Sequence, residues 1–128
     1  MTLRIDIKSP VPVYRQIVDG ARILLVNGEL NPGEQLPPVR RLALDLGVHF
    51  NTVAEAYRTL EEEGWLEIGR RGGARVVSRA APKGAEPETG EAFLRRLRAM
   101  VAEVQARGFP RVRIARELRR LAETLERS

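Results

Sequence analysis

Apolar residues recur at helical spacing in three stretches of the first half of the chain. The first stretch begins at Pro12 and stops at Asn27-Gly28, the second runs from residue 39 to Gly47, and the third from about residue 50 to residue 63. Each pattern predicts a helix that buries one face. The apolar positions that define the three faces are Val13, Ile17, Ala21, Leu24, Leu25, Val39, Leu42, Ala43, Leu46, Val53, Ala56, Tyr57 and Leu60.

Two short stretches after the third helix alternate weakly between apolar and polar residues. Residues 65–68 and 74–77 flank the run Gly69-Arg-Arg-Gly-Gly73, a pattern that predicts a β-hairpin with a basic, glycine-rich tip. The second and third helices are separated by three to four residues that include a glycine, the spacing of a helix-turn-helix. We therefore predict a mainly α fold with a small β-hairpin, a winged helix-turn-helix over residues 1–79.

The remainder of the chain predicts a linker followed by two more helices. Residues 80–90 contain prolines and glycines and almost nothing large to bury, which is typical of a linker. Residues 91–107 and 111–126 have helical periodicity around Gly108-Phe-Pro110, which predicts an antiparallel two-helix hairpin. The domain of residues 91–128 is below the size of about 40 residues at which an isolated unit folds unaided, so we predict a homodimer. The expected interface residues are Leu94, Leu97, Val101, Val104, Ile114, Leu118, Leu121 and Leu125.

The charge balance favours a polyanionic partner only modestly. The net charge is +5, with 22 basic and 17 acidic residues, and residues 1–79 hold 11 basic against 10 acidic side chains. A claim of nucleic-acid binding must therefore rest on where particular residues point. The absence of cysteine excludes disulfides and thiolate zinc sites and fits a cytoplasmic protein. No segment is apolar enough for a signal peptide or a membrane span, so we expect no membrane association.

Catalytic machinery is not evident in the sequence. None of the three serines lies in a Gly-x-Ser-x-Gly context, and the glycines at 69–73 lack the Lys-Ser/Thr ending of a phosphate-binding loop. The side chains of Glu61-Glu62-Glu63 point in different directions on a helix, which disfavours a metal site. We expect a protein that is not an enzyme and that needs no metal or cofactor.

The order of these motifs resembles a known family. The run Leu36-Pro-Pro-Val-Arg-Arg-Leu-Ala43, the run Leu46-Gly-Val-His-Phe-Asn-Thr-Val53 and the glycine-rich tip resemble the N-terminal DNA-binding domain of GntR-family transcriptional regulators over about residues 11–77. The tail resembles the short two-helix domain of the YtrA subfamily. The resemblance implies a sequence-specific regulator, a repressor that binds double-stranded DNA at a two-fold symmetric operator as a homodimer. It identifies neither the operator nor a small-molecule effector.

A helix-turn-helix of this kind presents the beginning of its third helix to the major groove. Asn51 and Thr52 lie there, and asparagine can pair with adenine in two hydrogen bonds while threonine can contact phosphate or a thymine methyl. The structural alternative is that both residues cap the helix. His49 precedes the helix, where it is either a neutral cap or a phosphate donor.

Two groups of arginines are further candidates for DNA contact. Arg40 resembles the arginine of the family's Leu-Pro-x-x-Arg motif, and Arg41 is its weaker neighbour. Arg70, Arg71, Gly72 and Gly73 form the tip, which would approach the minor groove or its phosphates. A flexible charged turn is the alternative for the tip.

Some positions depart from the family pattern. Phe50 and Ala54 stand where the family often has basic residues, and Glu55 on the outer face would repel phosphate unless it pairs with a cytosine amino group or with an arginine such as Arg58. Phe50 is expected to pack on the sugar-phosphate backbone or on a thymine methyl. These departures leave a rival hypothesis, a winged-helix protein-interaction module that has lost specific DNA binding. The salt dependence of DNA affinity discriminates between the two.

Overall fold

The computed structural model describes residues 3–70, 73–78 and 88–127 and divides the chain into two compact units, Met1–Lys83 and Gly84–Ser128. The predicted linker 80–90 lies outside the described residues except for 88–90, so its boundaries remain a prediction.

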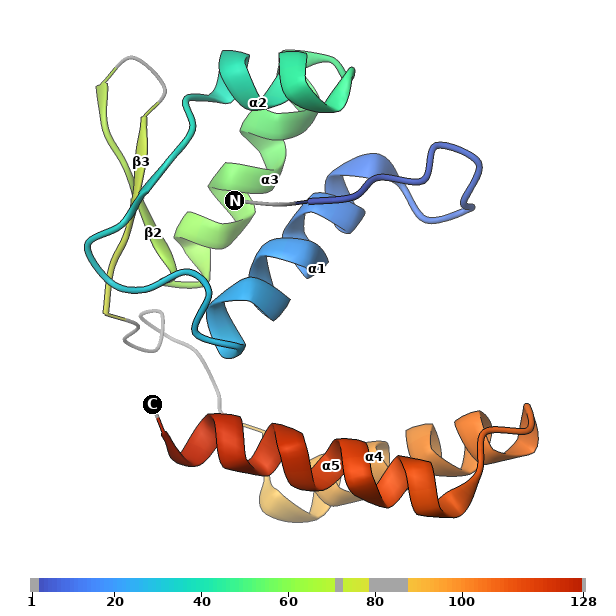
Figure 1. Cartoon of the computed structure of the whole chain (residues 1–128). Coiled ribbons are helices and arrows are strands. Elements are labelled where there is room, and N and C mark those ends of the chain that lie inside the picture. Colours follow the sequence, from blue (N-terminus) through green and yellow to red (C-terminus); the bar gives the residue numbers. More distant parts are fainter. Residues whose placement is uncertain (1–2, 71–72, 79–87, 128) are drawn as a thin grey trace. The chain divides into compact units, whose positions relative to one another are not determined.

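The three predicted helices of the N-terminal unit are confirmed. Helix α1 spans Val13–Val26, α2 spans Val39–Leu46 and α3 spans Phe50–Glu62 (Figure 1). Helix α2 ends at Gly47, whose φ of 70° lies in the left-handed region that favours glycine. There the amide of Val48 donates back to the carbonyl of Ala43 at 3.0 Å. The chain therefore turns tightly and starts α3 three residues after Gly47.

A three-stranded antiparallel sheet completes the unit. Strands β2 (Leu66–Ile68) and β3 (Ala74–Val76) form the predicted hairpin, and β1 (Gln35–Leu36) pairs with the other edge of β3, giving the order β1-β3-β2. The sequence pattern did not predict β1. Two residues between a turn and a pair of prolines are too few to show alternation, and the pairing of β1 depends on a partner strand about forty residues further along the chain.

The core lies around α3, which packs against α1, α2 and β2. Val53, Ala56, Tyr57 and Leu60 are buried as the periodicity predicts. The hydroxyl of Tyr57 donates to the carbonyl of Pro37 at 2.6 Å, and burial raises the pKa of this hydroxyl well above its usual range. The hydrogen bond ties the middle of α3 to the segment that leads into α2.

The acidic end of α3 has a structural role. One oxygen of the Glu63 carboxylate accepts from Nε of Arg22 at 2.9 Å and from the indole of Trp65 at 3.2 Å, and its other oxygen pairs with the same guanidinium. The hydrogen bond to Glu63 is the main cause that raises the pKa of Arg22. Glu61 accepts from the amide of Ile68 at 3.0 Å. Two of the three consecutive glutamates thus connect α3 to α1 and β2, and within the described ranges no cluster of residues could hold a metal ion.

The C-terminal unit is the predicted helical hairpin. Helices α4 (Gly90–Ala106) and α5 (Arg111–Glu126) are joined by a turn in which Gly108 has a φ of 98°. The hydroxyl of Thr89 accepts from the amide of Ala92 at 3.1 Å and so caps α4. Neither helix contains a buried residue. No helix in the described part of the chain is both long and apolar enough to cross a membrane.

Candidate nucleic-acid interface

His49 supplies the cap of α3. Its Nδ1 accepts a hydrogen bond from the amide of Asn51 at 3.1 Å. An imidazole that accepts at Nδ1 carries its proton on Nε2, so the second ring nitrogen is a donor. Because the side chain of His49 is exposed, the two roles predicted for it, cap and phosphate donor, are compatible in one side chain.

Phe50, His49 and Arg40 form a stack at the start of α3. The rings of His49 and Phe50 lie 4.9 Å apart at an angle of 24°, and the guanidinium carbon of Arg40 lies over the Phe50 ring at 5.4 Å from its centroid. Such a cation–π contact stabilises an exposed arginine by about 0.5–1 kcal/mol. Phe50 thereby holds Arg40, which comes from α2, beside the first residues of α3.

An apolar depression borders this stack. Its volume is about 380 Å³. Leu44 is 79% exposed at its edge and Phe50 is 44% exposed. Helical periodicity does not identify Leu44 as a site residue, but a leucine outside the inward-facing stripe of α2 is a sequence signal that could have found it. The residues that line the depression are Arg40, Ala43, Leu44, Val48, His49 and Phe50.

Asn51 is exposed at the first turn of α3, and its side chain makes no hydrogen bond within the described part of the chain. Thr52 is half-buried, and its amide donates to the carbonyl of His49 at 3.1 Å. The cap comes from His49, so the side chains of Asn51 and Thr52 are not needed for that purpose. Among the described residues Glu55 and Arg58 form no ion pair with each other; the carbonyl of Glu55 accepts from the hydroxyl of Thr59.

Arg41 differs from its neighbour Arg40. Its Nε lies 3.3 Å from a carboxylate oxygen of Asp45 one turn along α2. Exposed pairs of this kind contribute little to stability, about 0.3–0.5 kcal/mol, but the carboxylate offsets the charge that Arg41 would bring to a phosphate.

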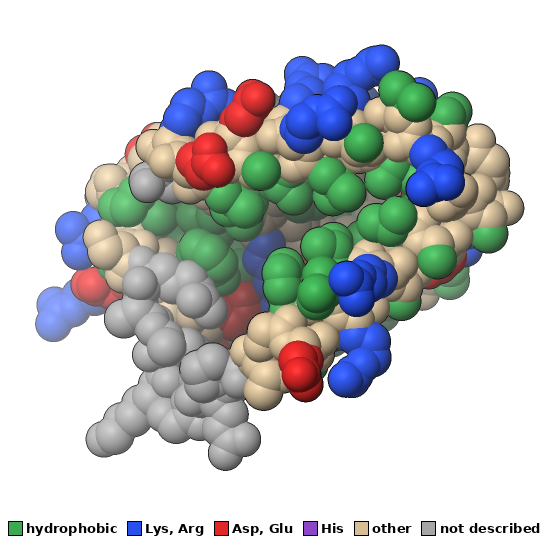
Figure 2. Space-filling view, turned by 90° about the horizontal axis from the view of Figure 1, so that it is seen from below, with side chains coloured by type: hydrophobic (Ala, Val, Ile, Leu, Met, Phe, Trp, Pro, Cys, Tyr) green, Lys and Arg blue, Asp and Glu red, His purple; other side chains and the backbone are tan. Residues whose placement is uncertain are grey.

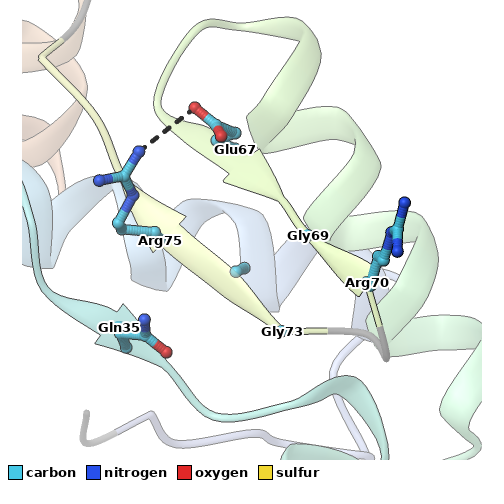
Figure 3. Close-up of a pocket in the computed structure, with 7 residues that line it drawn as sticks. Gln35, Glu67, Gly69, Arg70, Gly73 and Arg75 are labelled. Atoms are coloured by element: carbon cyan, nitrogen blue, oxygen red, sulfur yellow. Dashed lines mark hydrogen bonds and ion pairs between the residues drawn. The ribbon is translucent and has the colours of Figure 1, made fainter.

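A backbone hydrogen bond joins the two described ends of the wing tip. The amide of Gly69 donates to the carbonyl of Gly73 at 2.8 Å. Arg70 is exposed and lies apart from the ion pair between Glu67 and Arg75 (Figure 3). Arg71 and Gly72 lie outside the described residues. The residues that line the depression beside the tip, about 230 Å³ in volume, are Gln35, Glu67, Gly69, Arg70, Gly73, Ala74 and Arg75.

The fold itself does not require glycine at the two described tip positions. A Cβ added to Gly69 would meet the carbonyl oxygen of Gly73 at 3.7 Å, and one added to Gly73 would meet that of Arg70 at 3.9 Å, both ordinary contact distances. Neither glycine has a positive φ. The absence of side chains there matters instead for how closely another molecule can approach the tip.

Comparison with known proteins places this geometry in a family. Residues 13–76, from the start of α1 to the end of β3, match the family described as bacterial regulatory proteins, gntR family. The chain belongs to the GntR family. It is a DNA-binding transcriptional regulator with a winged helix-turn-helix.

Three relatives narrow this assignment. The GntR-family chain is 38% identical over 78 residues to the transcriptional repressor YtrA of Bacillus subtilis, covering 61% of this chain and 60% of that one. It is 44% identical over 87 residues to the transcriptional regulator Rv1152 of Mycobacterium tuberculosis, covering 65% and 68% of the two chains. The solved structure of YtrA from Sulfolobus acidocaldarius, a GntR-family transcription factor, covers 97% of this chain and 99% of its own, with 31% identity and a TM-score of 0.58. These likenesses support the YtrA-like subfamily within the GntR family.

Proposed function

We propose that this GntR-family regulator is a repressor that binds a two-fold symmetric operator as a homodimer. It would act in the cytoplasm, where it would occupy the operator and so block transcription. The observation that carries the proposal is the stack of Arg40, Phe50 and His49 beside the exposed Asn51. This stack places hydrogen-bond donors and an apolar surface side by side where α3 begins.

The candidate residues fall into three groups by their roles in this proposal. Asn51 and Thr52 meet base edges in the major groove, and Arg40 and His49 donate to phosphates. Arg41 adds a weaker phosphate contact. The wing residues Arg70, Arg71, Gly72 and Gly73 approach the minor groove or its phosphates. Figure 1 supports a joint surface, because α2 and the end of the hairpin that bears the tip lie at the same end of the N-terminal unit.

The C-terminal unit supports the homodimer. Several of its apolar side chains are exposed in one copy, among them Leu94 by 41%, Leu121 by 42% and Leu125 by 54%. Figure 2 shows hydrophobic side chains along the groove between the two helices, with arginines at its margins. A second copy would cover these side chains and complete a four-helix core. The proposed interface residues are Leu94, Leu97, Val101, Val104, Ile114, Leu118, Leu121 and Leu125.

Selection of bound sequences from a random duplex pool, followed by titration of the selected site across salt concentrations, tests the proposal. We expect an inverted repeat and a steep loss of affinity with salt, with a log–log slope of about −0.9 for each phosphate contact. Arg40→Ala should make this slope shallower by about 0.9 per half-site. Arg15→Ala is the matched control, since Arg15 is also exposed but lies over Tyr14 on α1. No consensus and a flat slope would instead support the interaction module.

A further inference from the structure

Phe50 is an exposed aromatic ring that contacts two donor side chains and lines an apolar depression. His49 and Arg40 stack on it, while Leu44 and Val48 line the same depression. In the free protein Phe50 and Leu44 leave apolar surface in water, and burying such surface is favourable. A ligand that fits here therefore combines an anionic part for the donors with an apolar group for the depression.

DNA offers one apolar group of this kind at a base edge in the major groove. The C5 methyl of thymine projects there, and cytosine lacks it. Phe50 and Leu44 have no side-chain donor or acceptor, so they cannot tell purines apart by hydrogen bonds. They can discriminate only by covering or failing to cover a methyl group.

We propose that Phe50, together with Leu44 and Val48, binds the 5-methyl group of one pyrimidine in each operator half-site, while Arg40 and His49 hold neighbouring phosphates. Phe50 is then a specificity residue that selects thymine over cytosine. The same pocket accepts 5-methylcytosine, because the group it contacts is the methyl. This inference deepens the proposed function and rests on it.

Replacement of thymine by deoxyuridine in the selected operator removes the methyl and leaves base pairing and the sugar-phosphate backbone unchanged. Affinities are measured by fluorescence anisotropy for operators in which one symmetric pair of thymines is replaced at a time. At one symmetric position, replacement of thymine by deoxyuridine should lower affinity about fourfold per half-site, because one buried methyl group contributes about 0.8 kcal/mol. Replacement in both half-sites should therefore lower affinity about fifteenfold. At that position 5-methylcytosine should bind about fourfold per half-site more tightly than cytosine.

Variants locate the effect in the protein. Phe50→Ala should bind the thymine and deoxyuridine operators with equal affinity. Ile23→Ala should keep the wild-type difference, since Ile23 is also an exposed apolar residue, by 59%, but lies on α1 away from the depression. Circular dichroism checks that both variants fold.

The outcomes separate the two proposals. The wild-type protein could bind its operator specifically and in a salt-dependent way, with an affinity that no deoxyuridine replacement changes. This result overturns the methyl pocket, that is, the proposed contact of Phe50, Leu44 and Val48 with a pyrimidine methyl, and it leaves the proposed function standing. An equal loss of affinity on deoxyuridine replacement in the wild-type and Phe50→Ala proteins also overturns the methyl pocket, because another residue then contacts the methyl group. Failure to select any operator overturns both. If Phe50→Ala binds too weakly to measure, Leu44→Ala takes its place, because Leu44 is the other exposed apolar residue of the depression. A thymine preference in Leu44→Ala equal to that of the wild-type protein then overturns the methyl pocket.

Discussion

The hydroxyl of Tyr57 connects α3 to the segment that leads into α2. It donates to the carbonyl of Pro37, three residues before Arg40. Tyr57→Phe removes this hydrogen bond, so we expect a loss of about 1 kcal/mol in the free energy of unfolding near neutral pH, measured by urea denaturation. A stability equal to that of the wild-type protein would show that the bond contributes nothing net.

The same hydroxyl predicts a change in stability at alkaline pH. Tyrosine ionises near pH 10 in the unfolded chain, whereas burial raises the pKa of Tyr57 in the folded protein. Above about pH 10 the folded state therefore holds a proton that the unfolded state has lost, and stability falls as pH rises, by up to about 1.4 kcal/mol per pH unit. Tyr57→Phe lacks this group, so its stability should fall less steeply between about pH 10 and 11. Parallel curves for the two proteins would contradict the prediction.

For single residues, the sequence could predict which side chains face the core, but it could not predict which hydrogen bonds and stacking contacts they make. The buried faces of α1, α2 and α3 follow from helical periodicity. The bond from Tyr57 to Pro37 joins residues twenty positions apart, and the stack of Arg40 on Phe50 depends on side-chain rotamers that no periodicity encodes. The sequence left open whether His49 or the pair Asn51 and Thr52 caps α3, and the structure shows the cap hydrogen bond at His49.

At the scale of the element, α3 depends on the imidazole that caps it. His49→Ala removes the acceptor for the amide of Asn51 and should destabilise the protein by about 0.5–2 kcal/mol. His49→Ser supplies another good cap and should restore most of that stability. Thermal or urea unfolding measures both variants.

The serine variant also separates capping from DNA contact. It lacks the ring that stacks on Phe50 and the Nε2 donor, so its operator affinity should stay below that of the wild-type protein although its stability recovers. Full recovery of affinity would show that His49 acts only as a cap.

The homodimer proposed above depends on the exposed apolar side chains of the C-terminal unit. Leu97→Asp places a charge on that face, and an unpaired buried carboxylate costs several kcal/mol. We expect this variant to sediment as a monomer and to bind the operator weakly. Fusion of its N-terminal unit to an unrelated dimerisation domain should restore binding.

Ala102→Asp is the matched control for this prediction. Ala102 is exposed on α4 and lies about 140° around the helix from Leu97, so the same charge there should leave the dimer intact. A dimeric Leu97→Asp protein would show that this face is not the interface. Monomers from both variants would show that the added charge acts on folding rather than on the interface.

The two-residue strand β1 has a consequence for how tightly the protein can hold DNA. Its pairing of Gln35 with Arg75 and of Leu36 with Ala74 fastens the wing to the chain just before α2. The wing is therefore linked by backbone pairing to the segment that leads into α2 and α3, and part of the entropic cost of ordering these elements is met when the protein folds. In the proposed complex, once α3 has bound the major groove, the wing would meet the duplex as an intramolecular ligand at high effective concentration. The contacts of α3 and of the wing with DNA, each weak alone, would then act together as a chelate. A variant that disrupts the β1–β3 pairing would weaken both contacts without changing a residue that makes them.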